Sequence, residues 1–204
     1  MKIGILGGSG RMGQGLARGY ANAGHEVILG SRSAQRAIDT ASGLGDGVSG
    51  GSLADAAQIG ELVVLAVPFG DAVATVEPLR DSLAGKIVID ITNPFGAVPP
   101  GQVAGIENNC RAADSARWVA AYKTTFWKTL EEPGKDGQVR DVFVNGQDEE
   151  AKRIVMQLIT ETGFRPIDCG GFENARTLDL MVPLMLELDS RYHADAGSSW
   201  KFLG

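Results

Sequence analysis

The chain has 204 residues, of which 44% are hydrophobic and 22% charged, with a formal net charge of −6. This balance is typical of a folded globular domain, excludes a fibrous or disordered chain, and argues against a nucleic-acid partner. The apolar runs are far shorter than the roughly 20 residues of a membrane span, and the first residues do not read as a secretion signal, so we expect no membrane partner and a cytoplasmic protein. Cys110 and Cys169 are too far apart in the sequence for a zinc motif, and we expect free thiols and no metal.

The first third of the chain predicts alternating strands and helices. Residues 2–6 form a short apolar run, and the glycine-rich segment after them leads into a helix with apolar positions at helical spacing. Residues 26–30 are expected to be the second strand, and Ser33 is expected to cap a helix that ends near Gly43. A weak strand at Val48 and a helix over residues 53–59, capped by Ser52, follow.

Two later runs, 62–67 and 86–91, are apolar at almost every position. This pattern is typical of parallel strands that are covered on both faces. A helix is expected between them, over residues 71–83. Alternation of this kind predicts an α/β fold, a Rossmann-type doubly wound and mostly parallel sheet with right-handed crossovers.

The second half of the chain is expected to extend this sheet and to end in a small α/β cap. Residues 93–105 contain three prolines and three glycines and are expected to form a loop, as are the polar residues 131–138. We divide the chain into a nucleotide-binding domain over residues 1–145 and a C-terminal cap and dimerisation segment over residues 146–204. Further strands are expected over residues 118–122, 141–144 and 164–169, and further helices over 148–163 and around 178–186.

The glycine-rich turn predicts binding of a dinucleotide. Gly8, Gly10 and Gly13 form a G-x-G-x-x-G pattern directly after a strand and at the start of a helix. The first glycine permits the tight turn, the second lets a pyrophosphate approach the backbone, and the third brings helix and strand together. The free amides at the start of the helix also favour an anion. The alternative is a tight glycine turn that binds nothing.

The end of the second expected strand favours NADP over NAD. Chains that bind NAD usually carry an acidic residue there, which accepts hydrogen bonds from the ribose 2′-hydroxyl. This chain has Ser31, Arg32 and Arg36 instead, which match a 2′-phosphate through charge-assisted hydrogen bonds. The alternative is that both arginines are solvated side chains at a helix start. We expect NADP(H) as the cofactor.

The ends of the later strands are expected to complete the site, because ligands of open parallel sheets lie beyond the carboxyl ends of the strands. Val67, Pro68 and Asn93 are therefore further candidates for cofactor binding. Phe69 fits a core position equally well. Lys123 either contacts an anionic or carbonyl acceptor or points to solvent. No catalytic triad is present, and no role is assigned to His193.

The segments GGSGRMGQGLA (7–17), GHE (24–26) and GSR (30–32), with FRPIDCG (164–170), NAR (174–176) and KFL (201–203), carry a family likeness. They resemble the NADPH-dependent reductases of the deazaflavin coenzyme F420, over nearly the whole chain. The resemblance implies hydride transfer between the nicotinamide C4 and the deazaflavin C5, in a homodimer. It also places NADP contacts on Ser9, Arg11, Met12, Ser31, Arg32 and Arg36.

The segment YKTTFW (122–127) departs from this pattern, because relatives of the fold often carry FNT or LHT there. The turn TNP (92–94) also resembles flavin-using metalloreductases. The first hypothesis is therefore an NADP-dependent oxidoreductase whose acceptor is coenzyme F420 or a flavin-like molecule. A short cap that leaves the substrate against the nicotinamide agrees with a flat ring acceptor. The alternatives are a reductase of a small carbonyl or imine and a non-catalytic NADPH-binding sensor.

Overall fold

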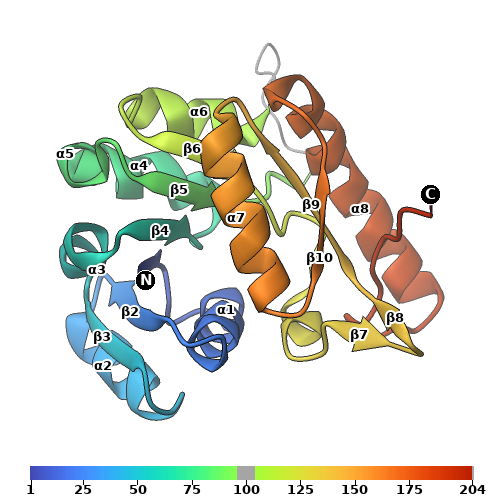
Figure 1. Cartoon of the computed structure of the whole chain (residues 1–204), viewed down its shortest axis with the longest axis horizontal. Helices are drawn as coiled ribbons and strands as arrows, with labels where there is room; N and C mark the ends of the chain where they lie inside the picture. Colours follow the sequence, from blue (N-terminus) through green and yellow to red (C-terminus); the bar gives the residue numbers. More distant parts are fainter. Residues whose placement is uncertain (96–103, 204) are drawn as a thin grey trace.

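An eight-stranded sheet in the order β10-β9-β6-β5-β4-β1-β2-β3 runs through the computed structural model, which describes residues 1–95 and 104–203 (Figure 1). Six neighbouring strands are parallel, in the order β3-β2-β1-β4-β5-β6, which is the order of a doubly wound dinucleotide-binding sheet. The predicted fold class is therefore confirmed. These six strands are β1 (Lys2–Leu6), β2 (Glu26–Ser31), β3 (Val48–Ser52), β4 (Leu62–Leu65), β5 (Ile87–Asp90) and β6 (Arg117–Ala120).

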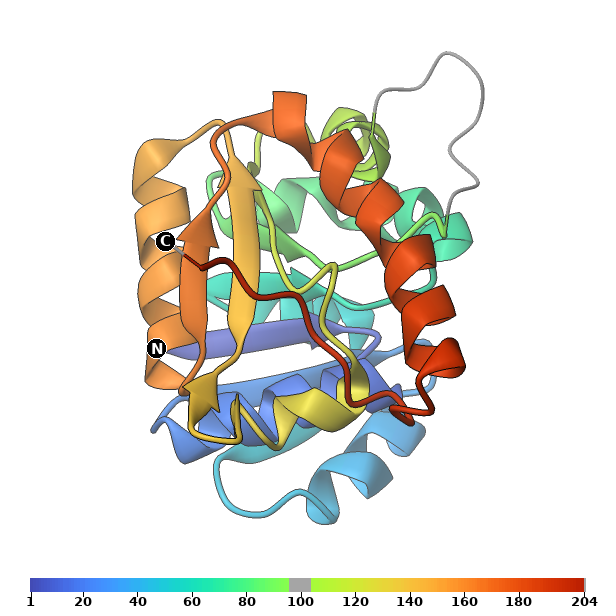
Figure 2. The ribbon, with the colours of Figure 1, turned by 90° about the vertical axis from the view of Figure 1, so that its right-hand side faces the viewer.

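Two strands of the C-terminal part extend the same sheet beyond β6, at the edge opposite β3. β9 (Asp141–Gly146) pairs antiparallel with β6, and β10 (Arg165–Asp168) pairs parallel with β9. The expected division between residues 145 and 146 lies at the end of β9. The last residues of the chain cross the face of β9 and β10, where the Phe202 amide donates to the Asp141 carboxylate at 2.8 Å (Figure 2).

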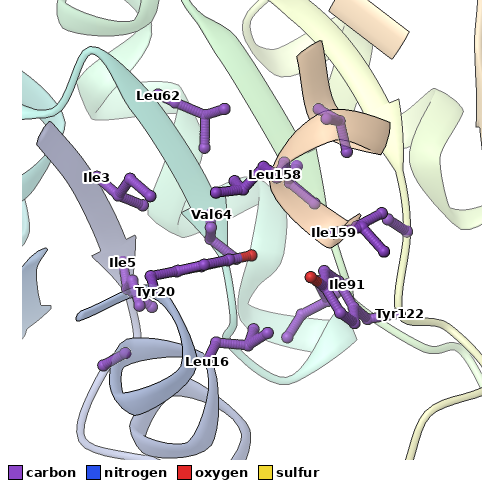
Figure 3. Close-up of a cluster of buried hydrophobic side chains, with 14 of the residues drawn as sticks. Ile3, Ile5, Leu16, Tyr20, Leu62, Val64, Ile91, Tyr122, Leu158 and Ile159 are labelled. Carbon is purple, nitrogen blue, oxygen red and sulfur yellow. The ribbon is translucent and has the colours of Figure 1, made fainter. Parts of the chain in front are cut away.

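Helices cover both faces of the sheet, and each face has its own core. Alternate strand residues such as Ile3 and Ile5 pack with Leu16, Tyr20 and Leu158 on one face (Figure 3). Their neighbours in the strands pack against the helices of the other face. The helices are α1 (Arg11–Asn22), α2 (Ala34–Ser42), α3 (Leu53–Ile59), α4 (Ala72–Val76), α5 (Arg80–Leu83), α6 (Gly105–Ala112), α7 (Glu149–Glu161) and α8 (Ala175–Arg191).

The expected helix starts lie where the sequence places them. Ser33 caps α2, Ser52 and Asp55 form a capping box at α3, and Asp148 caps α7. Among the described residues, no helix combines the length and apolar character that a membrane crossing requires.

The structure corrects three expectations about elements. Residues 131–138 are not a plain loop, because β7 (Gly134–Lys135) and β8 (Gln138–Val139) form a short hairpin there. The expected helix over residues 71–83 is divided into short helical turns, since Pro78 lacks an amide hydrogen to donate. The loop expected over residues 93–105 ends at the unpredicted helix α6, and its residues 96–103 lie outside the described part.

Candidate functional site

The turn between β1 and α1 is fixed against the end of β2. The Gly7 and Gly8 amides both donate to the Gly30 carbonyl, at 2.9 and 3.1 Å, and the Gly10 amide donates to the Gly7 carbonyl at 3.1 Å. Gly10 is the N-cap residue of α1, and within the described residues no side chain caps this helix start. The first amides of α1 are therefore available to an anion.

The three motif glycines have different reasons to be glycine. A Cβ at Gly8 would lie 2.7 Å from the Leu29 side chain, and a Cβ at Gly13 would lie 2.7 Å from the Gly8 Cα. At Gly10 the nearest atom to a Cβ is the Gly7 carbonyl oxygen at 3.5 Å, an ordinary contact. The protein itself thus has room for a side chain at Gly10. A missing side chain there keeps the surface over the helix start free, which fits a pyrophosphate.

A pocket of about 350 Å³ opens beside this turn and gathers the expected 2′-phosphate residues. Ser9, Ser31, Arg32 and Arg36 all line it. The Arg32 side chain is 84% exposed, and its guanidinium nitrogen lies 4.0 Å from the carboxylate of Asp71 across the pocket. Two cations and a hydroxyl group thus line the same pocket, and such groups can hold a phosphate.

A second cleft, of about 630 Å³, adjoins the first, and both are lined by Gly10, Val67 and Pro68. It lies beyond the carboxyl ends of β4, β5 and β6, and α8 forms its opposite wall. Asn93 and Lys123 also line it. Most of its surface is apolar, with side chains that include Met12, Phe69, Ile91, Phe126 and Trp127.

Trp127 places an aromatic ring in the wall of this cleft. The Arg11 guanidinium lies 5.0 Å from the centre of the indole, and the Lys128 ammonium lies 5.6 Å from it. Such cation–π contacts hold the ring in position. Arg11 is also the first residue of α1. The Trp127 ring therefore lies beside the phosphate turn, a contact that the sequence did not predict.

Lys123 does not point to solvent, which corrects one of the two expectations for it. Its side chain is 2% exposed, and its ammonium lies 3.8 Å from Asp90 and 3.4 Å from Asp179. The same ammonium donates to the Thr92 carbonyl. Sequence reasoning missed Asp90 and Asp179. The only signal was that Asp90 ends an apolar strand, with no sign of a partner.

Asn93 links the ends of β5 and β6. Its side-chain nitrogen donates to the Lys123 carbonyl at 2.8 Å, while its buried Oδ1 has no hydrogen-bond partner within the described part of the chain. Asn93 lines the apolar cleft. A buried acceptor without a donor is costly, so a ligand amide at this place would be stabilised.

The remaining titratable candidates lie outside the cleft lining. His193 follows α8 and His25 pairs with Glu161 at 3.0 Å; neither is among the lining residues. Burial raises the pKa of the Cys110 thiol to about 12, with a further contribution from the Asp90 charge, so Cys110 is an inert thiol. The described residues contain no cluster of three or more His, Cys, Asp or Glu that could hold a metal.

Comparisons with known proteins match a family model, curated relatives and solved structures. A family model described as "NADP oxidoreductase coenzyme F420-dependent" matches residues 2–94. The F420-dependent NADP reductase of Methanocaldococcus jannaschii is 33% identical, with 94% of each chain covered. The enzyme of that name from Methanothermobacter thermautotrophicus is also 33% identical, over 94% of this chain and 90% of its own. A solved structure of a candidate F420-dependent NADP reductase from Arthrobacter sp. FB24 superposes with a TM-score of 0.88 at 30% identity, covering 100% of both chains.

Proposed function

The chain belongs to the family of F420-dependent NADP reductases, and we propose that it transfers hydride between NADP(H) and the deazaflavin ring of coenzyme F420. The observation that carries this proposal is the pair of adjoining pockets. One gathers cations beside an uncapped helix start, and the other is an apolar cleft at the strand ends. A dinucleotide that spans both would place its reactive ring in the apolar cleft.

We assign the binding of NADP(H) to four groups of residues. The amides of the turn and of the start of α1 hold the pyrophosphate. Ser31, Arg32 and Arg36 hold the 2′-phosphate. Asn93 offers its unpaired Oδ1 to the nicotinamide carboxamide. The turn and the first residues of α1 contribute Gly8, Ser9, Gly10, Arg11, Met12 and Gly13, and the loop after β4 contributes Val67 and Pro68.

The second cleft suits direct hydride transfer. When bound, the nicotinamide supplies or accepts the hydride at C4 and the deazaflavin at C5. The apolar walls exclude water and hold two flat rings face to face, which is the main requirement of such a reaction. Among the lining residues the structure describes, Arg11 and Lys123 alone carry titratable side chains, and Lys123 is engaged with buried carboxylates.

This lining disfavours a small carbonyl as the substrate. Reduction of a carbonyl forms an alkoxide, which a general acid normally protonates. The cleft offers no carboxyl, imidazole or phenol group for that task among its described lining residues. Reduction of a deazaflavin also takes up a proton, but at the ring nitrogen N1, away from the C5 that accepts the hydride, so no acid is needed beside the reacting carbon.

The two parts of the chain divide the work in this proposal. Residues 1–145 bind NADP(H), and residues 146–204 close the acceptor side through Val182, Met185 and Leu186 of α8. We also propose that the protein is a homodimer. Leu180 and Leu184, one turn apart on α8, are 52% and 50% exposed, and a second copy would cover them.

The test is to mix the protein with NADPH and, separately, with F420, FMN, FAD and a panel of small carbonyls and imines. Loss of NADPH absorbance together with reduction of F420 is expected. Turnover with carbonyls or imines alone contradicts the proposal. Tight NADPH binding without turnover of any acceptor would favour the sensor hypothesis instead.

A further inference from the structure

Three charged side chains are almost completely buried beside the apolar cleft, and one of them, Lys123, lines it. The Asp90, Lys123 and Asp179 side chains are 0%, 2% and 1% exposed. The Lys123 ammonium lies between the two carboxylates, 3.8 Å from Asp90 Oδ1 and 3.4 Å from Asp179 Oδ1. Buried charges of this kind are costly unless they are paired, so the lysine satisfies both acids together.

The cluster joins separate elements around the site. Asp90 ends β5; its Oδ1 accepts from the Thr92 amide at 2.7 Å and its Oδ2 from the Asn109 side chain at 2.9 Å. It thereby fixes the loop that carries Asn93. Asp179 belongs to α8, and its Oδ2 accepts from the Gly105 amide, at the start of α6, at 2.9 Å. Its Oδ1 has no hydrogen bond to any described residue and faces Lys123.

Asp179 lies one turn before the residues of α8 that line the cleft. Val182 follows it by three positions, and Met185 and Leu186 come one turn later. On a helix these residues share neighbouring faces, so the place of Asp179 fixes how far the wall stands from the strand ends. Figure 1 shows α8 beyond β9 and β10, outside the sheet. Its position therefore depends on side-chain contacts and not on strand pairing.

We propose that Lys123 is a positioning residue whose buried ammonium ties Asp179 of α8 to Asp90 at the end of β5, and so sets the width of the cleft in which the hydride acceptor meets the nicotinamide. The link between Asp179, Lys123 and Asp90 is observed in the structure, whereas its effect on the acceptor rests on the proposed function. Lys123 lies in the segment that departs from the family pattern, and this role accounts for a lysine there.

The first variant is Asp179→Asn. Its amide oxygen can still accept from the Gly105 amide, and one buried negative charge is removed, so the variant is expected to fold. Only the ion pair with Lys123 is lost. The displaced wall is expected to worsen KM or kcat for F420 by about tenfold or more, because small misplacements of reacting rings are costly. The Kd of NADPH, which depends mainly on the phosphate contacts, should stay within about twofold.

Lys123→Met is the second variant, and it leaves two buried carboxylates without a cation. It is expected to be less stable than Asp179→Asn and to show the same acceptor defect. The double variant should be no worse with F420 than Lys123→Met alone, since both changes break one interaction.

Lys152→Met is the matched control. Lys152 is also a buried lysine between two carboxylates, 4% exposed and 3.0 Å from both Glu149 and Asp168, but it lies on α7 away from the cleft. This variant is expected to unfold at a lower temperature with unchanged kinetics for F420. An equal acceptor defect in Lys152→Met would mean that lost stability, and not the wall, explains the effect.

Hydrogen exchange of the α8 amides gives a readout that does not depend on turnover. We expect exchange in α8 to be at least about fivefold faster in Asp179→Asn and unchanged in Lys152→Met. Wild-type exchange rates and F420 kinetics in Asp179→Asn would overturn the proposal. A wild-type protein that binds NADPH but does not reduce F420 would instead refute the proposed function. The exchange data would then still test whether Lys123 holds α8 in place.

Discussion

Gly10 is a position where the proposed ligand, and not the packing of the protein, requires glycine. Among the described residues, the nearest atom to a methyl group at Gly10 is the Gly7 carbonyl oxygen at 3.5 Å, and the Gly10 backbone is extended at φ −79° and ψ 164°. Gly10→Ala is therefore expected to keep the melting temperature within a few degrees and to weaken NADPH binding by about tenfold or more, because the Cβ would meet the pyrophosphate.

Gly13→Ala is the contrasting variant, since its Cβ would lie 2.7 Å from the Gly8 Cα. It should lower the melting temperature as well as the affinity. Calorimetry and titration of both variants measure the two effects. Normal NADPH affinity in Gly10→Ala would show that no ligand passes over this residue.

The arginines at the end of β2 should distinguish the two nicotinamide cofactors. Arg32→Ala removes a charge-assisted hydrogen bond worth about 1.5–3 kcal/mol, so the Kd of NADPH should rise roughly tenfold to a hundredfold. The Kd of NADH should hardly change, because NADH lacks the 2′-phosphate. Arg153→Ala is the control, because Arg153 is also an exposed arginine and lies on α7, away from this pocket. Equal losses for NADPH and NADH would contradict the assignment.

Residue by residue, the sequence indicates the local part of the site far better than the distant part. The turn, Ser31, Arg32 and Arg36 lie close together in the chain, and the structure brings them to one pocket. Lys123 could not be understood in this way. Its partners Asp90 and Asp179 come from β5 and α8, so its burial follows from the packing of the whole chain.

At the level of elements, the start of α7 depends on Asp148. The Asp148 carboxylate accepts from the Ala151 amide at 2.9 Å and from Arg117 at 2.6 and 2.9 Å. Asp148→Ala should lower the free energy of unfolding by about 1–2 kcal/mol, as loss of a helix cap does. Asp148→Asn keeps a capping side chain and should cost less, since a half-exposed ion pair contributes at most about 1 kcal/mol.

Denaturant unfolding of both Asp148 variants measures this difference. If the two variants lose the same free energy, the ion pair with Arg117 matters and the cap does not.

Elements whose apolar residues recur at a regular spacing, or that begin at a capping residue, were predictable from the sequence. The others were not. β1, β2, β4 and β5 have apolar runs that indicate their positions directly, whereas β3, with the sequence VSGGS, gives only a weak signal at Val48. α6 has the sequence GIENNCRA, in which polar residues hide the buried face. The hairpin β7–β8 has two residues in each strand, too few for any alternation to show.

At the scale of the molecule, a buried carboxylate fastens the C-terminal tail. Asp141 accepts from Arg165, Lys201 and the Phe202 amide. Burial alone would raise its pKa, but these hydrogen bonds hold the pKa at about 2. Because the folded value lies below the ordinary one, the stabilisation is present above about pH 4 and is lost as the pH falls toward 2.

The free energy of unfolding is therefore expected to fall by about 2 kcal/mol through Asp141 between pH 5 and pH 2, given about 1.4 kcal/mol for each pKa unit. Asp141→Asn should be less stable at neutral pH and should show a shallower acid dependence. Unfolding curves at several pH values measure both slopes, and identical slopes would contradict the role of Asp141.

The exposed leucines of α8 provide a test of the proposed dimer. Leu184→Glu puts a charge where a second copy would bury an apolar side chain, so light scattering should show a shift from dimer to monomer. Ile59→Glu is the control, because Ile59 is 48% exposed on α3, away from that face. A wild-type protein that is monomeric at micromolar concentration would refute the dimer.

The close approach of α2 to β3 explains a glycine whose role the composition alone does not reveal. A Cβ at Gly50 of β3 would lie 2.3 Å from the Ala37 backbone. Glycine is needed there so that helix and strand can touch, a reason set by tertiary packing. The 28 glycines of the sequence therefore do not all serve the nucleotide.

β6 and β9 are paired through Val119 with Gly146 and Ala120 with Asn145. Residues 1–145 and 146–204 thus share one sheet, without a flexible linker between two bodies. A hinge between these two parts would have to break the backbone hydrogen bonds that join β6 and β9. Both ligands must enter and leave through the mouth of the cleft, past side chains such as Phe95 and Leu186, which are 62% and 40% exposed. We therefore expect no swing of one domain against the other to limit turnover.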